Sequence, residues 1–162
     1  MKILYIVMLT ALFCPVLTSA QKMTNRDLDF WIGEWDCYSG DSIIGDNKIF
    51  KTLDGIVIEE NFHSFKEGFV GKSWSVFDSI ASLWKQTWVD NSGSYMVFSG
   101  AVDKDTLIFA EDNPVTLKGQ KVYRRMIFYS MQSDSFDWKW QSSTDKINWK
   151  TNWYIKYKRK TK

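Results

Sequence analysis

Residues 149–158, WKTNWYIKYK, alternate between two kinds of side chain, and this constrains the fold more than any other segment. One set is Trp149, Thr151, Trp153, Ile155 and Tyr157, and the other is Lys150, Asn152, Tyr154, Lys156 and Lys158. Successive side chains of a β-strand point to opposite faces of the sheet. The segment is therefore predicted to be a strand with its aromatic face inside and its lysines in water.

The same period of two recurs along most of the chain, whereas helical spacing is confined to residues 1–20 and to the short segment TNRDLDFW. Turn-forming residues separate ten candidate strands, at 34–39, 47–52, 56–65, 71–77, 84–89, 95–99, 106–111, 121–131, 135–142 and 149–158. A meander of this size hides its edges best by closing. The fold is predicted to be all-β, an antiparallel up-and-down barrel of about 8–10 strands after a short helical turn.

Residues 1–20, MKILYIVMLTALFCPVLTSA, have the features of a signal peptide: an early lysine, an apolar run and a small-residue end. We expect cleavage before Gln21, a secreted or periplasmic location, and no stable membrane insertion afterwards. Residues 21–162 then form one domain, a length that suits a single core.

Composition argues against several classes of function. A net charge of +2 gives no reason to expect a nucleic-acid partner. Beyond the signal, Cys37 is the only cysteine and His63 the only histidine, so neither an internal disulfide nor a zinc site is predicted. The phase of residues 56–65 places His63 outside the barrel. No cofactor is expected.

The segment DFWIGEWD, residues 29–36, contains a Gly-x-Trp pattern at Gly33 and Trp35. Together with the basic Arg159 near the end of the last strand, it resembles the lipocalin or calycin superfamily. In that superfamily the arginine packs over the tryptophan, so the resemblance implies a structural role for Gly33, Trp35 and Arg159.

The ordered series of motifs extends the likeness over nearly the whole mature chain: DFWIGEWD, GIVIEENF, GKSWSVFD, WKQTWVD and WQSSTDKINW. This series resembles a group of exported, lipocalin-like bacterial proteins classed as a domain of unknown function. The resemblance implies an architecture and no established reaction. Lys146 departs from it, because such proteins often carry a glycine-rich hairpin there.

Strand phase predicts which side chains face the interior. Three rows are expected: Ile56, Ile58, Glu60 and Phe62; Ser73, Ser75 and Phe77; and Trp84, Gln86, Trp88 and Asp90. Trp138 and Trp140 join from the far side. An aromatic interior with a few polar groups is typical of a ligand pocket.

Glu60 stands between Ile58 and Phe62, so its carboxylate must find a partner or take up a proton. Arg124 or Arg125 is the expected partner, and phase does not decide which. Three roles for Glu60 stay open: one member of a structural ion pair, a polar anchor for a ligand, or a general acid or base. Catalysis would pair Glu60 with Asp90 or Asp78 across the cavity, and Glu60 and Asp90 are the candidate catalytic residues.

The residues favour a binding protein over an enzyme. The predicted function is an exported barrel that holds a partly apolar, aromatic or sugar-like small molecule. Its candidate ligand-binding residues are Glu60, Phe62, Trp84, Gln86, Trp88, Arg125, Trp138 and Trp140. Two alternatives stay open: a hydrolase or isomerase acting through Glu60 and Asp90, and a protein-interaction module without a small ligand. The latter would show a large exposed apolar patch.

Overall fold

A computed structural model describes residues 23–66 and 68–161. The expected signal peptide, residues 1–20, lies outside the described residues. The chain begins with a short 3-10 turn, η1 (Asp29–Trp31). Eleven strands follow: β1 (Gly33–Ser39), β2 (Ser42–Thr52), β3 (Val57–Ser64), β4 (Val70–Asp78), β5 (Leu83–Asp90), β6 (Tyr95–Asp103), β7 (Thr106–Glu111), β8 (Val115–Leu117), β9 (Gln120–Tyr129), β10 (Ser135–Ser143) and β11 (Lys150–Arg159).

Ten of these strands form a closed antiparallel barrel. The order runs from β1 to β7 and then through β9, β10 and β11, which pairs with β1 and closes the ring. Strand β8 was not predicted; it is only three residues long, pairs with β9 and stands outside the barrel. The predicted up-and-down barrel with a short N-terminal turn is confirmed.

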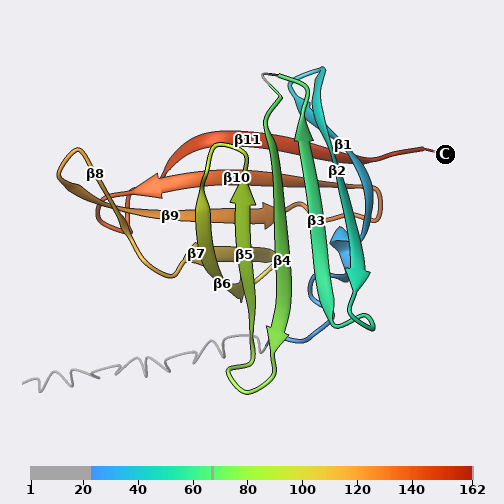
Figure 1. The fold of residues 1–162 in the computed structure, drawn as a ribbon, viewed down its shortest axis with the longest axis horizontal. Helices are drawn as coiled ribbons and strands as arrows, with labels where there is room; N and C mark the ends of the chain where they lie inside the picture. The colour runs from blue at the N-terminus through green and yellow to red at the C-terminus, as the bar shows by residue number, and fades with distance from the viewer. Residues whose placement is uncertain (1–22, 67, 162) are drawn as a thin grey trace, which may run out of the picture.

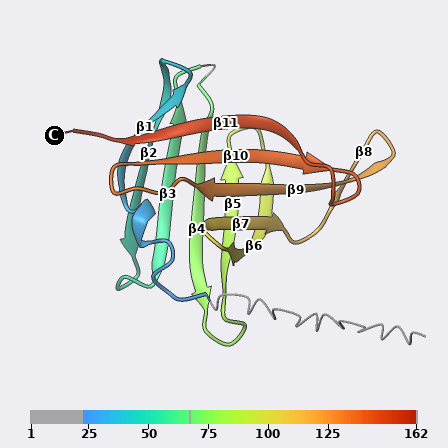
Figure 2. The same cartoon turned by 180° about the vertical axis from the view of Figure 1, so that it is seen from behind.

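The barrel has two faces whose strands cross. In Figure 1, β2 to β5 run along one direction, and β9, β10 and β11 run across them behind. Figure 2, seen from behind, shows β9 to β11 in front of the same strands. Inward side chains of the two faces therefore meet across the interior, as in orthogonal sheet packing.

Burial follows the predicted alternation in most strands. On β11, Ile155 and Tyr157 are buried, while Lys156 and Lys158 are exposed. The predicted inward row of β3 holds at Ile58, Glu60 and Phe62. It fails at Ile56, which is 65% exposed because the strand begins one residue later.

The prediction that Trp149 and Thr151 face the interior is also wrong. A β-bulge shifts the register so that Trp140 pairs with Trp153 but Gln141 pairs with Thr151. A bulge inserts one residue and reverses which face the following side chains occupy. Thr151 and Trp149 therefore lie on the outer face, where Gln141 donates a hydrogen bond to the Thr151 hydroxyl (3.1 Å).

The base of the barrel is closed around Trp35, which is completely buried. The Trp35 indole N–H donates to the carbonyl of Trp31 in η1 (2.8 Å). The Arg159 guanidinium lies 4.1 Å from the Trp35 ring centroid and donates to the carbonyl of Ile32 (2.9 Å). Gly33 has a φ of +144°, and a Cβ there would overlap the same guanidinium. The expected packing of Arg159 over Trp35 is confirmed.

Candidate ligand-binding cavity

A band of polar side chains crosses the inner face of four neighbouring strands. It consists of Asn47 on β2, Glu60 on β3, Ser73 and Ser75 on β4, and Gln86 on β5, all buried. Each of these residues occupies an inward position of its strand. We call this set the polar band. Buried polar groups need partners, so their hydrogen bonds indicate which atoms remain free for a ligand.

Glu60 is held by two neutral donors. The Asn47 amide donates to one carboxyl oxygen (2.6 Å), and the Ser73 hydroxyl donates to the other (2.5 Å). Burial raises the pKa of Glu60 to about 7, against the opposing effect of these two bonds. The expected arginine partner is wrong, because no cationic side chain among the described residues forms an ion pair with Glu60.

Besides the amide oxygen of Asn47, two buried groups of the barrel interior have polar atoms without a hydrogen-bond partner among the described residues. The Gln86 amide nitrogen donates to the Ser75 hydroxyl (3.0 Å), and its carbonyl oxygen accepts nothing within the described residues. The indole N–H of Trp31 is likewise unpaired in the described part of the chain. Leaving such a group unsatisfied costs about 1–3 kcal/mol. Both residues line the same interior cavity, so a bound molecule can supply the missing partners.

The cavity has a volume of about 280 Å³ and lies between the polar band and the opposite face. Glu60 and Gln86 line it from one side. Side chains of β9, β10 and β11 line it from the other: Met126, Phe128, Trp138, Trp140, Trp153 and Ile155. We call these six residues the apolar wall. This volume lies just below the usual range for small-molecule pockets, about 300–1,000 Å³, and so suits a small ligand.

Half-buried residues surround the cavity at the end opposite η1. They are Phe69 in the turn after β3, Trp88 and Asp90 at the end of β5, and Ser94 in the turn before β6. The Phe69 and Trp88 rings stack with centroids 6.4 Å apart. We call this group the mouth. Phe69 lies outside any strand, so the period of two that predicts interior residues carried no signal for it.

Asp90 organises the turn beneath the mouth. It accepts hydrogen bonds from the Trp88 indole N–H (2.9 Å) and from the backbone N–H groups of Ser92 (3.0 Å) and Ser94 (3.1 Å). Burial acts to raise the pKa of Asp90, but hydrogen bonds from the Ser92 hydroxyl, the Trp88 indole and the Ser94 backbone outweigh it and hold the pKa at about 2. Asp90 therefore stays ionised and its oxygens are already in use.

The two arginines of β9 lie on opposite faces. Arg124 lines the cavity, donates through Nε to Glu111 (2.6 Å) and makes a second bond to it through Nη2. Arg125, the predicted ligand-binding residue, is on the outer face with its guanidinium 3.8 Å from the Trp149 ring centroid. Both phases of residues 124–129 contain large apolar side chains, so periodicity did not separate these alternatives.

Trp84 is the other predicted binding residue that does not line the cavity. It is buried at the base, where its indole N–H donates to the carbonyl of Thr24 (3.0 Å) and its ring packs against Phe77. Trp84 thus fills the barrel. The other predicted binding residues line the cavity: Glu60, Phe62, Gln86, Trp88, Trp138 and Trp140.

Several lining residues were not among the predicted binding residues. They are Trp31, Phe69, Asp90, Ser94, Met96, Phe98, Arg124, Met126, Phe128, Trp153, Ile155 and Tyr157. The inward positions of Trp153 and Tyr157 follow from strand phase. Phase alone did not show which part of the interior stays open and which part is filled.

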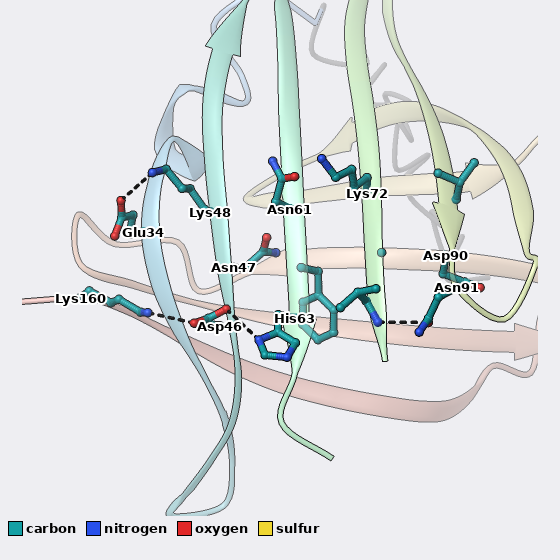
Figure 3. Close-up of a pocket in the computed structure, with 14 residues that line it drawn as sticks. Glu34, Asp46, Asn47, Lys48, Asn61, His63, Lys72, Asp90, Asn91 and Lys160 are labelled. Carbon is teal, nitrogen blue, oxygen red and sulfur yellow. Dashed lines mark hydrogen bonds and ion pairs between the residues drawn. The ribbon is translucent and has the colours of Figure 1, made fainter. Parts of the chain in front are cut away.

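A second, larger depression lies on the outer face of β2 to β5, with a volume of about 680 Å³ (Figure 3). Most of its charged groups are already paired: Lys48 with Glu34 (3.2 Å), Asp46 with Lys160 (3.2 Å), and Lys72 with Glu59 (3.6 Å). The His63 ring lies beside Asp46 (3.8 Å). The predicted outward position of His63 is confirmed. The inner cavity is the better candidate site, because its lining joins a largely apolar wall to two residues with unpaired buried polar atoms, Trp31 and Gln86.

Gly71 on β4 makes room for Trp88, since a Cβ at this position would overlap the indole ring. We expect Gly71→Ala to destabilise the fold by about 1–3 kcal/mol through overpacking. Denaturant titration measures this cost. In a Trp88→Ala background the same change should cost almost nothing, because the ring is gone. An equal cost in both backgrounds would contradict the assignment.

No protein-family model matches the chain, and no curated protein is significantly similar to it. Among residues 23–66 and 68–161, no helix is long and apolar enough to cross a membrane. In the same residues, no group of three or more His, Cys, Asp or Glu side chains is placed to hold a metal ion.

Proposed function

We propose that this protein binds a small, partly apolar molecule inside its barrel. The observation that carries the proposal is a cavity of about 280 Å³ with an apolar wall on one side and the unpaired Gln86 carbonyl oxygen on the other. A pocket that is mostly apolar with a few convergent polar groups is the usual form of a small-molecule site. A barrel filled by side chains would have left no such space.

We further propose that the chain is an exported member of the lipocalin-like, or calycin, superfamily. The contact between Arg159 and Trp35 at the barrel base supports the family, as does the closed antiparallel barrel. The sequence of residues 1–20 supports export to the periplasm or the exterior.

Native mass spectrometry of the protein purified from its own host tests the binding proposal. We expect a retained small molecule that is lost on unfolding. We also expect the mass of the denatured protein to correspond to a chain that begins at Gln21. Trp88→Ala removes an aromatic ring of the mouth, so this variant should be purified with less bound ligand. Trp74→Ala changes the outer face and should be purified with as much bound ligand as wild type. Repeated preparations of wild-type protein without any bound mass would contradict the proposal.

An enzyme is the second candidate, because a carboxyl group whose pKa is about 7 suits general acid or base chemistry. Both Glu60 and Asp90 line the cavity, as that hypothesis requires. Against it, Asp90 stays ionised and accepts several hydrogen bonds, so it is a poor partner for proton transfer. Binding without reaction is therefore the function that we propose.

A further inference from the structure

Three charged residues line the cavity, and they differ in whether an oppositely charged side chain pairs with them. Arg124 is held by Glu111 through two hydrogen bonds, and their side chains are 23% and 7% exposed. Asp90 is held by neutral donors at the mouth. Glu60, deepest of the three charged lining residues, is 7% exposed and has no cationic partner among the described residues. Asp90 and, when it is ionised, Glu60 both lack a cationic partner among the described residues, and Glu60 is the buried one of the two.

Aromatic rings gather near this carboxyl group. Phe62 follows Glu60 by two residues on the same strand and face. Its ring centroid lies 5.7 Å from that of Trp153 and 6.3 Å from that of Trp88, and Trp138 packs edge-on against Trp153. The faces of such rings attract cations, most strongly where water is excluded. The aromatic rings and the Glu60 carboxylate therefore both favour a positively charged ligand.

The unpaired oxygen of Gln86 requires a donor. Ser75 occupies only the nitrogen end of the amide, so the oxygen end has no partner among the described residues. An ammonium group offers up to three N–H donors, so it can serve both Glu60 and a second acceptor. The Glu60 carboxylate and the Gln86 oxygen are both hydrogen-bond acceptors, so they favour a ligand with several N–H donors.

An anionic ligand meets the opposite situation. Its charge would lie near Glu60, and the positive charge of Arg124, which also lines the cavity, is already compensated by Glu111. An anion beside Arg124 would then be a negative charge without a counter-charge of its own, and burying such a charge is unfavourable. The cavity therefore disfavours the binding of ligands that carry a carboxylate group.

We propose that the cavity selects an organic cation, a protonated amine on a flat apolar body, with Glu60 as its counter-charge. This inference rests on the proposed binding function and names the chemical class of its ligand. The apolar body packs between the apolar wall and the mouth, while the ammonium group faces the polar band.

Binding should depend on pH through Glu60. The groups around it are Asn47 on β2, Ser73 on β4, Cys37 on β1 and Tyr157 on β11. Burial raises the pKa of both Cys37 and Tyr157, so both stay neutral near pH 7. Asp90 keeps its charge over the same range, because its pKa is about 2, and Arg124 is paired with Glu111. The pKa of Glu60 is about 7, so amine affinity should fall about tenfold from pH 8 to pH 6.

Three probes of similar size test the selection: 2-phenylethylamine, 2-phenylethanol and 3-phenylpropanoate. Each is titrated into purified protein from which any retained molecule has been removed, at pH 8, by calorimetry and by tryptophan fluorescence. We expect the amine to bind at least about tenfold more tightly than the alcohol, and the carboxylate to bind most weakly. At pH 7 the amine should also release protons, seen as a binding enthalpy that changes with the buffer.

Glu60→Gln keeps the shape of the side chain and should bring the amine to the affinity of the alcohol and abolish the proton release. Glu59→Gln, on the outer face beside Lys72, is the matched control and should behave like wild type. Circular dichroism and a thermal melt establish that each variant is folded.

The outcomes separate the two proposals. Alcohol or carboxylate binding as tightly as the amine would overturn the cation inference and leave the binding function standing. Equal amine affinity in Glu60→Gln and wild type would also overturn it. No binding of any probe, together with no retained molecule in native mass spectrometry, would overturn both.

Discussion

Trp35→Ala will lower the free energy of unfolding by about 3–5 kcal/mol, the usual cost of removing a buried tryptophan. The side chain is 0% exposed, its ring lies 4.9 Å from that of Phe136, and its indole N–H holds the carbonyl of Trp31. Its loss leaves a cavity and removes the surface on which Arg159 stacks. Thermal and denaturant unfolding measure the effect, and a fall in Tm of roughly 10 °C or more is expected.

Trp74→Ala is the matched control. Trp74 is 40% exposed on the outer face of β4, so its truncation should cost less than about 1 kcal/mol. A similar loss for the two variants would mean that the base of the barrel does not depend on Trp35.

Glu60→Gln will stabilise the protein at pH 8 by about 3 kcal/mol and will have almost no effect at pH 4.5. The pKa of Glu60 is about 7 in the folded protein, against an ordinary value of 4.5 for a glutamate pKa. A carboxyl group whose pKa is raised on folding contributes stability while it is protonated. That contribution is complete below pH 4.5, is lost as the pH rises from 4.5 to 7, and changes little above 7.

Denaturant titrations of wild type and Glu60→Gln between pH 4.5 and pH 8 measure this difference. Glu59→Gln carries the same change of charge on the outer face and should give a nearly constant difference. A stabilisation by Glu60→Gln that does not vary with pH would show that Glu60 is not protonated in the folded state. A buried carboxylate that costs stability at neutral pH is typical of a residue retained for function.

The main features of the fold follow from local chemistry that is visible in the sequence. The period of two along residues 149–158 and their counterparts specifies strands, and ten such segments with short turns specify a closed meander. Glu60, Gln86 and Trp88 line the cavity as predicted, because an uninterrupted strand preserves its phase from one residue to the next.

Only the tertiary structure decided the details of the candidate site. The bulge between Trp140 and Gln141 turned Trp149 and Thr151 outward, and cross-strand register brought Asn47 and Ser73 to Glu60 in place of an arginine. Arg124 faces the cavity although both phases of its strand are equally apolar. The physical reason is that periodicity is a property of one strand, whereas register, bulges and unfilled space depend on how distant strands pack together.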